Sequence, residues 1–99
     1  MRSSATFHEE ASMDYDAAFD WYLARSADAA LKFDAEIDHA LTLITAAPER
    51  WLVGPFGTRR FILRKFPFIL FYREQPRGNI QVVAVAHTSR KPRYWKQRL

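Results

Sequence analysis

The chain has 99 residues, of which 48% are apolar, 26% are charged and none is cysteine. This length and composition predict one globular domain, residues 1–99, and exclude a disordered chain. The lack of cysteine excludes disulfides and thiolate metal sites, and the longest apolar run, residues 66–72, is too short to span a bilayer. We therefore expect a cytoplasmic location.

Positive charge is concentrated in the second half of the chain. Residues 1–49 carry three basic and ten acidic side chains, whereas residues 50–99 carry twelve basic side chains and the single acid Glu74. So basic a segment is typical of a surface that meets nucleic acid or an acidic protein. A solvated, solubilising face is the alternative.

The first half predicts two helices. From about Ser12, a possible N-cap, apolar residues recur at steps of three and four until about Arg25. Ser26 is well placed to cap a second helix, Ala27–Ala46, and Pro48 marks its end. Because the link between the helices is so short, we expect an antiparallel hairpin whose two apolar stripes must cover an apolar surface.

Three strand-like runs follow, rich in β-branched and aromatic residues, at 61–63, 68–72 and 80–86. Turn residues separate them, so the simplest arrangement is an antiparallel meander. A short edge strand at residues 5–7 is a weaker indication. The predicted fold is α+β: an N-terminal helical hairpin on one face of an antiparallel sheet, and a short C-terminal helical turn for which Pro92 suits the first position.

The segment between the hairpin and the strands, residues 49–58, is predicted to be a loop because it contains two glycines and a proline. It is unusually apolar for a loop. We expect its apolar side chains to plug one end of the core, with a partner-binding patch as the alternative. These side chains are Trp51, Leu52, Val53 and Phe56.

Two arginines, Arg60 and Arg64, flank the first predicted strand. Since strand side chains alternate between faces, Arg60 and Arg64 should lie on one side, beside the cations of the C-terminal segment. Guanidinium groups form forked hydrogen bonds with phosphates and carboxylates, so this row suits a phosphate or an acidic partner. The C-terminal cations are Arg90, Lys91, Arg93, Lys96 and Arg98.

Three other side chains near the C-terminus are candidates for function. His87 can act as a general acid or base, although a histidine at a strand end more often bonds the following loop. Tyr94 and Trp95 can stack on bases or close the core, and packing is the preferred interpretation for Trp95. No phosphate-binding glycine loop, nucleophile motif or metal-ligand spacing is present, so we expect neither a metal nor another cofactor.

Two segments carry a family resemblance: RRFILRKFPFILFY, which begins at Arg59, and IQVVAVAHTSRKPRYWKQR, which begins at Ile80. Together with the helical part they cover residues 7–98. The chain resembles the RelE/ParE superfamily of toxins from type II toxin–antitoxin systems, often called plasmid stabilisation proteins. The resemblance implies a helical hairpin against an antiparallel sheet. It also implies a hetero-oligomer with a cognate antitoxin, which blocks the toxin and represses their shared operon.

The superfamily has two branches with different targets. ParE-like toxins inhibit DNA gyrase and arrest growth, and they have no recognised hydrolytic centre. RelE-like toxins are ribosome-dependent endoribonucleases that cut messenger RNA without a metal. We favour the ParE-like branch, because nuclease members usually carry more acid–base groups on this face than the Lys65, Glu74 and His87 available here. A non-toxic binding module that keeps only the antitoxin contact is a third hypothesis.

The resemblance also suggests where contacts lie. Arg90 and Tyr94 match positions at which nuclease members often have phosphate-binding and acid–base groups, and His87 and Arg60 would complete such a site. We expect an enzyme only if that hypothesis holds. The residues expected to contact the target or the antitoxin are Arg60, Arg64, His87, Arg90, Tyr94, Trp95 and Arg98.

Overall fold

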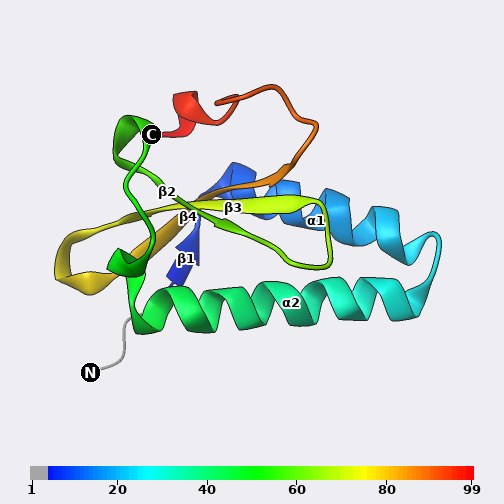
Figure 1. The fold of residues 1–99 in the computed structure, drawn as a ribbon. Helices are drawn as coiled ribbons and strands as arrows, with labels where there is room; N and C mark the ends of the chain where they lie inside the picture. Colours follow the sequence, from blue (N-terminus) through cyan, green and yellow to red (C-terminus); the bar gives the residue numbers. More distant parts are fainter. Residues whose placement is uncertain (1–4) are drawn as a thin grey trace.

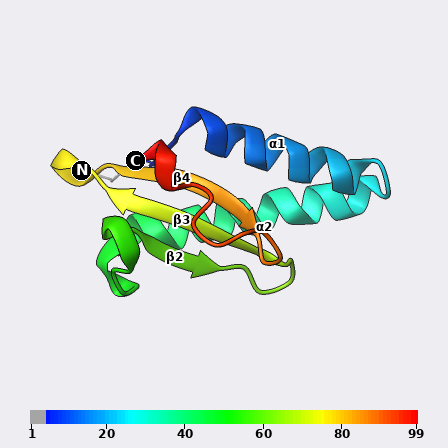
Figure 2. The ribbon, with the colours of Figure 1, turned by 90° about the horizontal axis from the view of Figure 1, so that it is seen from above.

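Two helices cover one face of a four-stranded sheet in the computed structural model, which describes residues 5–99 (Figure 1). The C-terminal segment, residues 88–99, crosses the opposite face (Figure 2). The predicted α+β architecture is thereby confirmed. The helices are α1 (Glu9–Leu23) and α2 (Ala27–Ala46), and the strands are β1 (Ala5–Phe7), β2 (Arg59–Ile62), β3 (Phe68–Glu74) and β4 (Ile80–His87).

The second helix agrees with its prediction, whereas the first begins earlier. Ser26 caps α2 by accepting the amide hydrogen of Ala29 on its hydroxyl at 3.2 Å. The prediction that Ser12 caps α1 is wrong. The chain turns into the helix directly after β1, and Nδ1 of His8 accepts the amide hydrogen of Glu10 at 3.0 Å. The helix ends at Leu23, two residues before the predicted end.

The strands lie in the order β1-β4-β3-β2. Strands β2, β3 and β4 form the predicted antiparallel meander. The short strand β1 is also present and pairs in parallel with the first residues of β4, from Ile80 to Val82. The sheet is therefore mixed: antiparallel in its three longer strands, with one short parallel strand at the edge.

A β-bulge changes the direction of the side chains in β4. Phe71 pairs with Ala84 and Tyr72 pairs with Val82, so Val83 has no opposite residue in β3. As a result Val82 packs toward the helices, whereas Val83 and Ala84 pack on the other face. The bulge therefore places two consecutive side chains, Val83 and Ala84, on the same face, where strict alternation would separate them.

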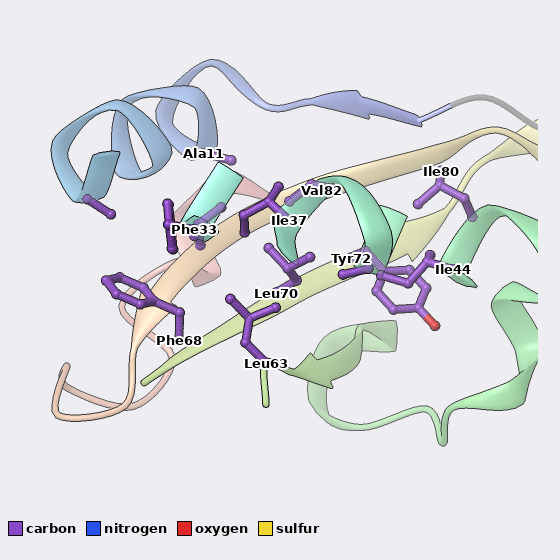
Figure 3. Packing of buried hydrophobic residues seen from close by; sticks show 13 residues of the cluster. Ala11, Phe33, Ile37, Ile44, Leu63, Phe68, Leu70, Tyr72, Ile80 and Val82 are labelled. Atoms are coloured by element: carbon purple, nitrogen blue, oxygen red, sulfur yellow. The ribbon is translucent and has the colours of Figure 1, made fainter. Parts of the chain in front are cut away.

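The main core lies between the helices and the sheet (Figure 3). Helix α2 contributes Phe33, Ile37 and Ile44, and the sheet contributes Leu70 and Tyr72, all of them at most 3% exposed. The helical spacing of four and seven residues along α2 explains why these side chains form one stripe. Among residues 5–99, no helix is long and apolar enough to cross a membrane.

Of the four apolar side chains in the loop before β2, only Trp51 packs against the main core as predicted. Trp51 packs against Phe61 with ring centroids 5.1 Å apart, but Leu52, Val53 and Phe56 are 90%, 56% and 54% exposed. Phe56 lies in the 3-10 turn Pro55–Gly57, where its φ is 61°. Apolar composition alone therefore did not predict which side chains of this loop are buried.

Candidate target-binding face

The face of the sheet opposite the helices carries the arginine predicted from β2. Arg60 and Ile62 are exposed, whereas Phe61 and Leu63 pack into the main core, so the predicted alternation is confirmed for these residues. Arg64 lies beyond the end of β2 at Ile62. Beside Arg60 lies a hollow of about 210 Å³ between the strands and the C-terminal segment. We call the exposed cations that line it the basic face: Arg60, Arg90, Lys91 and Arg93.

This hollow brings together five of the seven predicted contact residues. Its lining includes Arg60, His87, Arg90, Tyr94 and Trp95, which come from β2, from the end of β4 and from the C-terminal segment. The two others, Arg64 and Arg98, do not line it. Sequence spacing alone did not show that these distant segments meet.

A larger groove, of about 440 Å³, adjoins the hollow and shares five lining residues with it, among them Arg60 and Arg93. Its other wall is the apolar loop, with Leu52 and Val53. The hollow and the groove together present cations at their sides and apolar surface at one end. Such a surface fits a partner with acidic groups next to apolar ones.

Trp95 holds the C-terminal segment against the sheet. It is only 2% exposed, and its ring centroid lies 4.8 Å from that of Phe71 and 6.2 Å from that of Phe56. The interpretation of Trp95 as a packing residue is confirmed. With so little surface exposed, its ring forms part of the floor of the hollow and offers no free face for stacking on a base.

Tyr94 and Arg98 turn toward α1, where both bind Asp14. The Asp14 carboxylate accepts hydrogen bonds from the Tyr94 hydroxyl at 3.0 Å and from Nη1 and Nη2 of Arg98 at 2.7 and 3.2 Å. It also accepts the backbone amide hydrogen of Val85 at 3.1 Å. Nη1 of Arg98 donates in addition to the carbonyl of Val83 at 2.9 Å. We call Asp14, Tyr94 and Arg98 the C-terminal clasp.

The clasp completes the hydrogen bonding of β4 where the short strand β1 ends. Pairing with β1 extends only to Val82, whose carbonyl accepts the amide hydrogen of His8 at 2.9 Å. Beyond that point the Val83 carbonyl and the Val85 amide are bound by the side chains of the clasp. Sequence reasoning missed Asp14, because its partners lie more than 70 residues away along the chain.

Burial and the neighbouring charges fix the protonation of the clasp. Burial, followed by the charge of Asp14 and the hydrogen bond to it, raises the pKa of Tyr94 to about 12. Burial by itself would lower the pKa of Arg98, but the hydrogen bonds and charge of Asp14 outweigh it, so that pKa is raised. At neutral pH Tyr94 is therefore a neutral donor and Arg98 is a cation.

His87 and Arg90 occupy the edge of the hollow and are both exposed. Nδ1 of His87 accepts the amide hydrogen of Ser89 at 3.0 Å, the bond to the following loop that was expected of a histidine at a strand end. The guanidinium carbon of Arg90 lies 3.8 Å from the centroid of the Tyr94 ring. Arg90 therefore stacks on the clasp while its charge faces solvent.

The remaining candidates lie away from the hollow. The backbone amides of Arg64 and Lys65 donate to the Glu36 carboxylate of α2 at 2.5 and 3.1 Å, which ties that turn to the helical layer. Glu74 pairs with Arg59 across the strands at 3.2 Å. Within residues 5–99, no group of three histidine, aspartate or glutamate side chains is arranged to hold a metal ion.

A family profile described as "ParE toxin of type II toxin-antitoxin system, parDE" matches residues 5–92. The chain belongs to the ParE toxin family. It is accordingly the toxin of a type II toxin–antitoxin system, and its partner is an antitoxin. A comparison with curated proteins finds no match.

The ParE fold is also seen in a solved structure, "Chromosomal ParDE TA system from P. aeruginosa", with a TM-score of 0.72 and 23% sequence identity. The similarity covers 88% of this chain and 96% of that one. Within this ParE-family toxin, Arg60, His87 and Arg90 lie inside the residues matched by the family profile, whereas Tyr94 and Arg98 of the clasp lie beyond its end at residue 92.

Proposed function

We propose that this ParE-family toxin inhibits DNA gyrase and that its cognate antitoxin neutralises it. The observation that carries the proposal is the family match over residues 5–92. The matched residues include Arg60 of β2 and Arg90, which follows β4. Guanidinium groups on an exposed surface bind carboxylates and phosphates through forked hydrogen bonds. Gyrase bound to DNA presents both kinds of anion.

The basic face would make the contact with gyrase, with Arg60, His87 and Arg90 as its central residues. The adjoining groove supplies apolar surface next to the cations, because Leu52 is 90% exposed beside it. Tyr94, Trp95 and Arg98 would support these contacts from below, since they hold the C-terminal segment in place. Arg64 would lie at the margin of the contact.

A ribosome-dependent messenger-RNA nuclease remains the second candidate, because the hollow gathers the four residues which that hypothesis names: Arg60, His87, Arg90 and Tyr94. The state of Tyr94 argues against it. Its hydroxyl donates to Asp14, and its pKa is raised to about 12, whereas an efficient general acid or base has a pKa near the working pH. A nuclease would have to depend on His87 and the arginines.

The antitoxin would neutralise the toxin by covering the basic face, and loss of the antitoxin would then arrest growth. This is the behaviour of a module that stabilises a plasmid, and it requires action in the cytoplasm, where gyrase and its DNA are found. The third hypothesis, a non-toxic module that binds only an antitoxin, predicts normal growth when the chain is expressed alone.

The test is a pair of assays with the same purified chain. One measures the supercoiling of relaxed plasmid by gyrase, and the other follows intact messenger RNA in a translating extract. We expect supercoiling to fall while the messenger stays intact, and the Arg60→Ala/Arg90→Ala double variant to have lost the inhibition. Cleaved messenger with unaffected gyrase would establish the nuclease instead. No effect in either assay, together with normal growth on expression, would support the third hypothesis.

A further inference from the structure

We propose that Asp14 is a positioning residue for Arg90 on the basic face, and that it acts through the ring of Tyr94. The inference rests on the proposed function, in which Arg90 contacts the target. Asp14 lies on α1, in the acidic half of the chain, and sequence reasoning gave it no role. The structure links it to the basic face by two consecutive contacts.

The first contact fixes the tyrosine. The Tyr94 hydroxyl donates to Oδ2 of Asp14 at 3.0 Å, and the same oxygen accepts from Nη1 of Arg98 at 2.7 Å and from the amide of Val85 at 3.1 Å. Because a helix, a strand and the C-terminal segment all contribute to this cluster, the carboxylate has little freedom to move. The tyrosine ring is therefore held at both ends, by its backbone and by its hydroxyl.

The second contact places the cation. The guanidinium carbon of Arg90 lies 3.8 Å from the centroid of the Tyr94 ring, and that of Arg98 lies 5.0 Å from the same centroid. An exposed arginine ordinarily samples many rotamers, and ordering it on binding opposes association. Stacking on a fixed ring restricts Arg90 before the target arrives, which favours binding.

The backbone beside the tyrosine also needs support. Arg93 has a φ of 59°, a conformation that residues other than glycine rarely adopt. The two following residues hold it there, because the Tyr94 hydroxyl is bound to Asp14 and the Trp95 ring is buried against Phe71. Loss of the bond to Asp14 is therefore expected to relax this backbone together with the ring that supports Arg90.

A purely structural role for Asp14 makes a different prediction. If Asp14 only stabilised the fold, its effect on target binding would not depend on whether Arg90 is present. If it acts through Arg90, the effect disappears once Arg90 is removed. Tyr94→Phe is the most useful variant, because it removes the hydroxyl, keeps the ring and leaves the Asp14–Arg98 ion pair in place.

The first arm of the test needs no target. In a nuclear magnetic resonance spectrum of the arginine Nε–H groups, the Arg90 signal, assigned by its loss in Arg90→Lys, is expected to be shifted upfield by the Tyr94 ring. In Asp14→Asn and Tyr94→Phe the Arg90 signal should move toward the position of the signal of exposed Arg64.

The control is Glu36→Gln, which removes a comparable carboxylate charge at the turn before β3 and should leave the Arg90 signal unchanged. If the Arg90 signal keeps its wild-type position in both Asp14→Asn and Tyr94→Phe, the proposal is overturned. If Asp14→Asn does not fold, Tyr94→Phe decides alone.

The second arm measures inhibition of gyrase by the wild type, Tyr94→Phe, Arg90→Ala and the double variant. Tyr94→Phe is expected to raise the half-inhibitory concentration about fivefold when Arg90 is present and to have no further effect in Arg90→Ala. An equal factor in both backgrounds would overturn the positioning role. If the wild type does not inhibit gyrase, the proposed function fails, and the resonance arm still decides whether Asp14 positions Arg90.

Discussion

The indole ring of Trp95 lies against the ring of Phe71 in β3, with centroids 4.8 Å apart and planes 34° from parallel. With Val83 and Ala84 of β4 this pair forms a second, small core on the face of the sheet away from the helices. The shape of that face therefore depends on a residue only four positions from the end of the chain.

Removing the Trp95 ring should destabilise the protein strongly. Trp95 is 2% exposed, and truncation of a buried tryptophan to alanine costs about 3–5 kcal/mol. We expect the free energy of unfolding of Trp95→Ala, measured with urea, to fall by that amount. Trp21→Ala is the matched control, because Trp21 is 53% exposed. The free energy of unfolding of this variant should fall much less. Equal losses in the two variants would contradict this account of the second core.

Arg60 and Arg64 carry the same charge and are both exposed, but only Arg60 lines the hollow. On the proposed function, Arg60→Ala is expected to weaken inhibition of gyrase about tenfold, which corresponds to one lost charge-assisted hydrogen bond. Arg64→Ala should change it less than about twofold. Both side chains are exposed, so neither variant should alter the melting temperature appreciably. A larger effect of Arg64→Ala would place the contact near the turn after β2 instead.

The chain has four tyrosines, and burial raises the pKa of each of them above its ordinary value of about 10. For Tyr72 and Tyr94 the raised pKa is about 12. A raised tyrosine pKa means that the folded state holds the proton more tightly than the unfolded chain. The stability that this contributes is fully present below pH 10 and is lost as the pH rises through about 12.

This pH dependence can be measured on the intact protein. The contribution of the tyrosines to the free energy of unfolding should not change with pH up to about pH 10 and should then decrease. Phenolate absorbance should appear only above the ordinary tyrosine range while the protein remains folded. In Tyr94→Phe the decrease above pH 10 should be less steep, because one of the shifted groups is gone. A tyrosine that titrates at its ordinary pKa in the folded protein would contradict these assignments.

Much of the fold followed from local sequence patterns. The Ser26 cap, the stripe along α2 and the three-stranded meander were all predicted correctly, because capping, helical periodicity and strand propensity depend on neighbouring residues. The His8 cap was missed, because it depends on where β1 ends against β4. No local pattern distinguishes that histidine from the more usual capping serine at position 12.

The site was predicted less completely than the fold. The basic residues were identified, but composition could not show that Arg60 meets the loop after β4 or that Arg64 does not. The clasp also could not be derived, because the bulge at Val83 and the partners of Asp14 exist only after the chain has folded. Long-range polar contacts of this kind leave no periodic signal in the sequence.

The apolar loop gives a prediction in which the structure replaces the expectation from sequence. If Leu52 plugged the core, truncation would cost several kcal/mol, but its 90% exposure predicts a change within about 0.5 kcal/mol for Leu52→Ser. Ile44→Ala, a fully buried aliphatic control, should cost about 2–5 kcal/mol. Thermal or chemical unfolding measures the free energy of unfolding of both variants. A loss of several kcal/mol for Leu52→Ser would show that Leu52 is buried in the core as the sequence predicted.

The two serines near the helix starts allow a matched comparison of a real cap with a false one. Ser26 accepts the amide hydrogen of Ala29, so Ser26→Ala should lower the free energy of unfolding by about 1 kcal/mol. Ser26→Asp should keep most of the stability that the cap provides, because aspartate is also a good N-cap. Ser12 is exposed inside α1, where alanine is the better helix former, so Ser12→Ala should be neutral or stabilise by up to about 0.5 kcal/mol. Urea unfolding of the three variants measures these differences. A loss of about 1 kcal/mol for Ser12→Ala, with no loss for Ser26→Ala, would mean that α1 begins at Ser12 in solution and that the His8 cap is not formed.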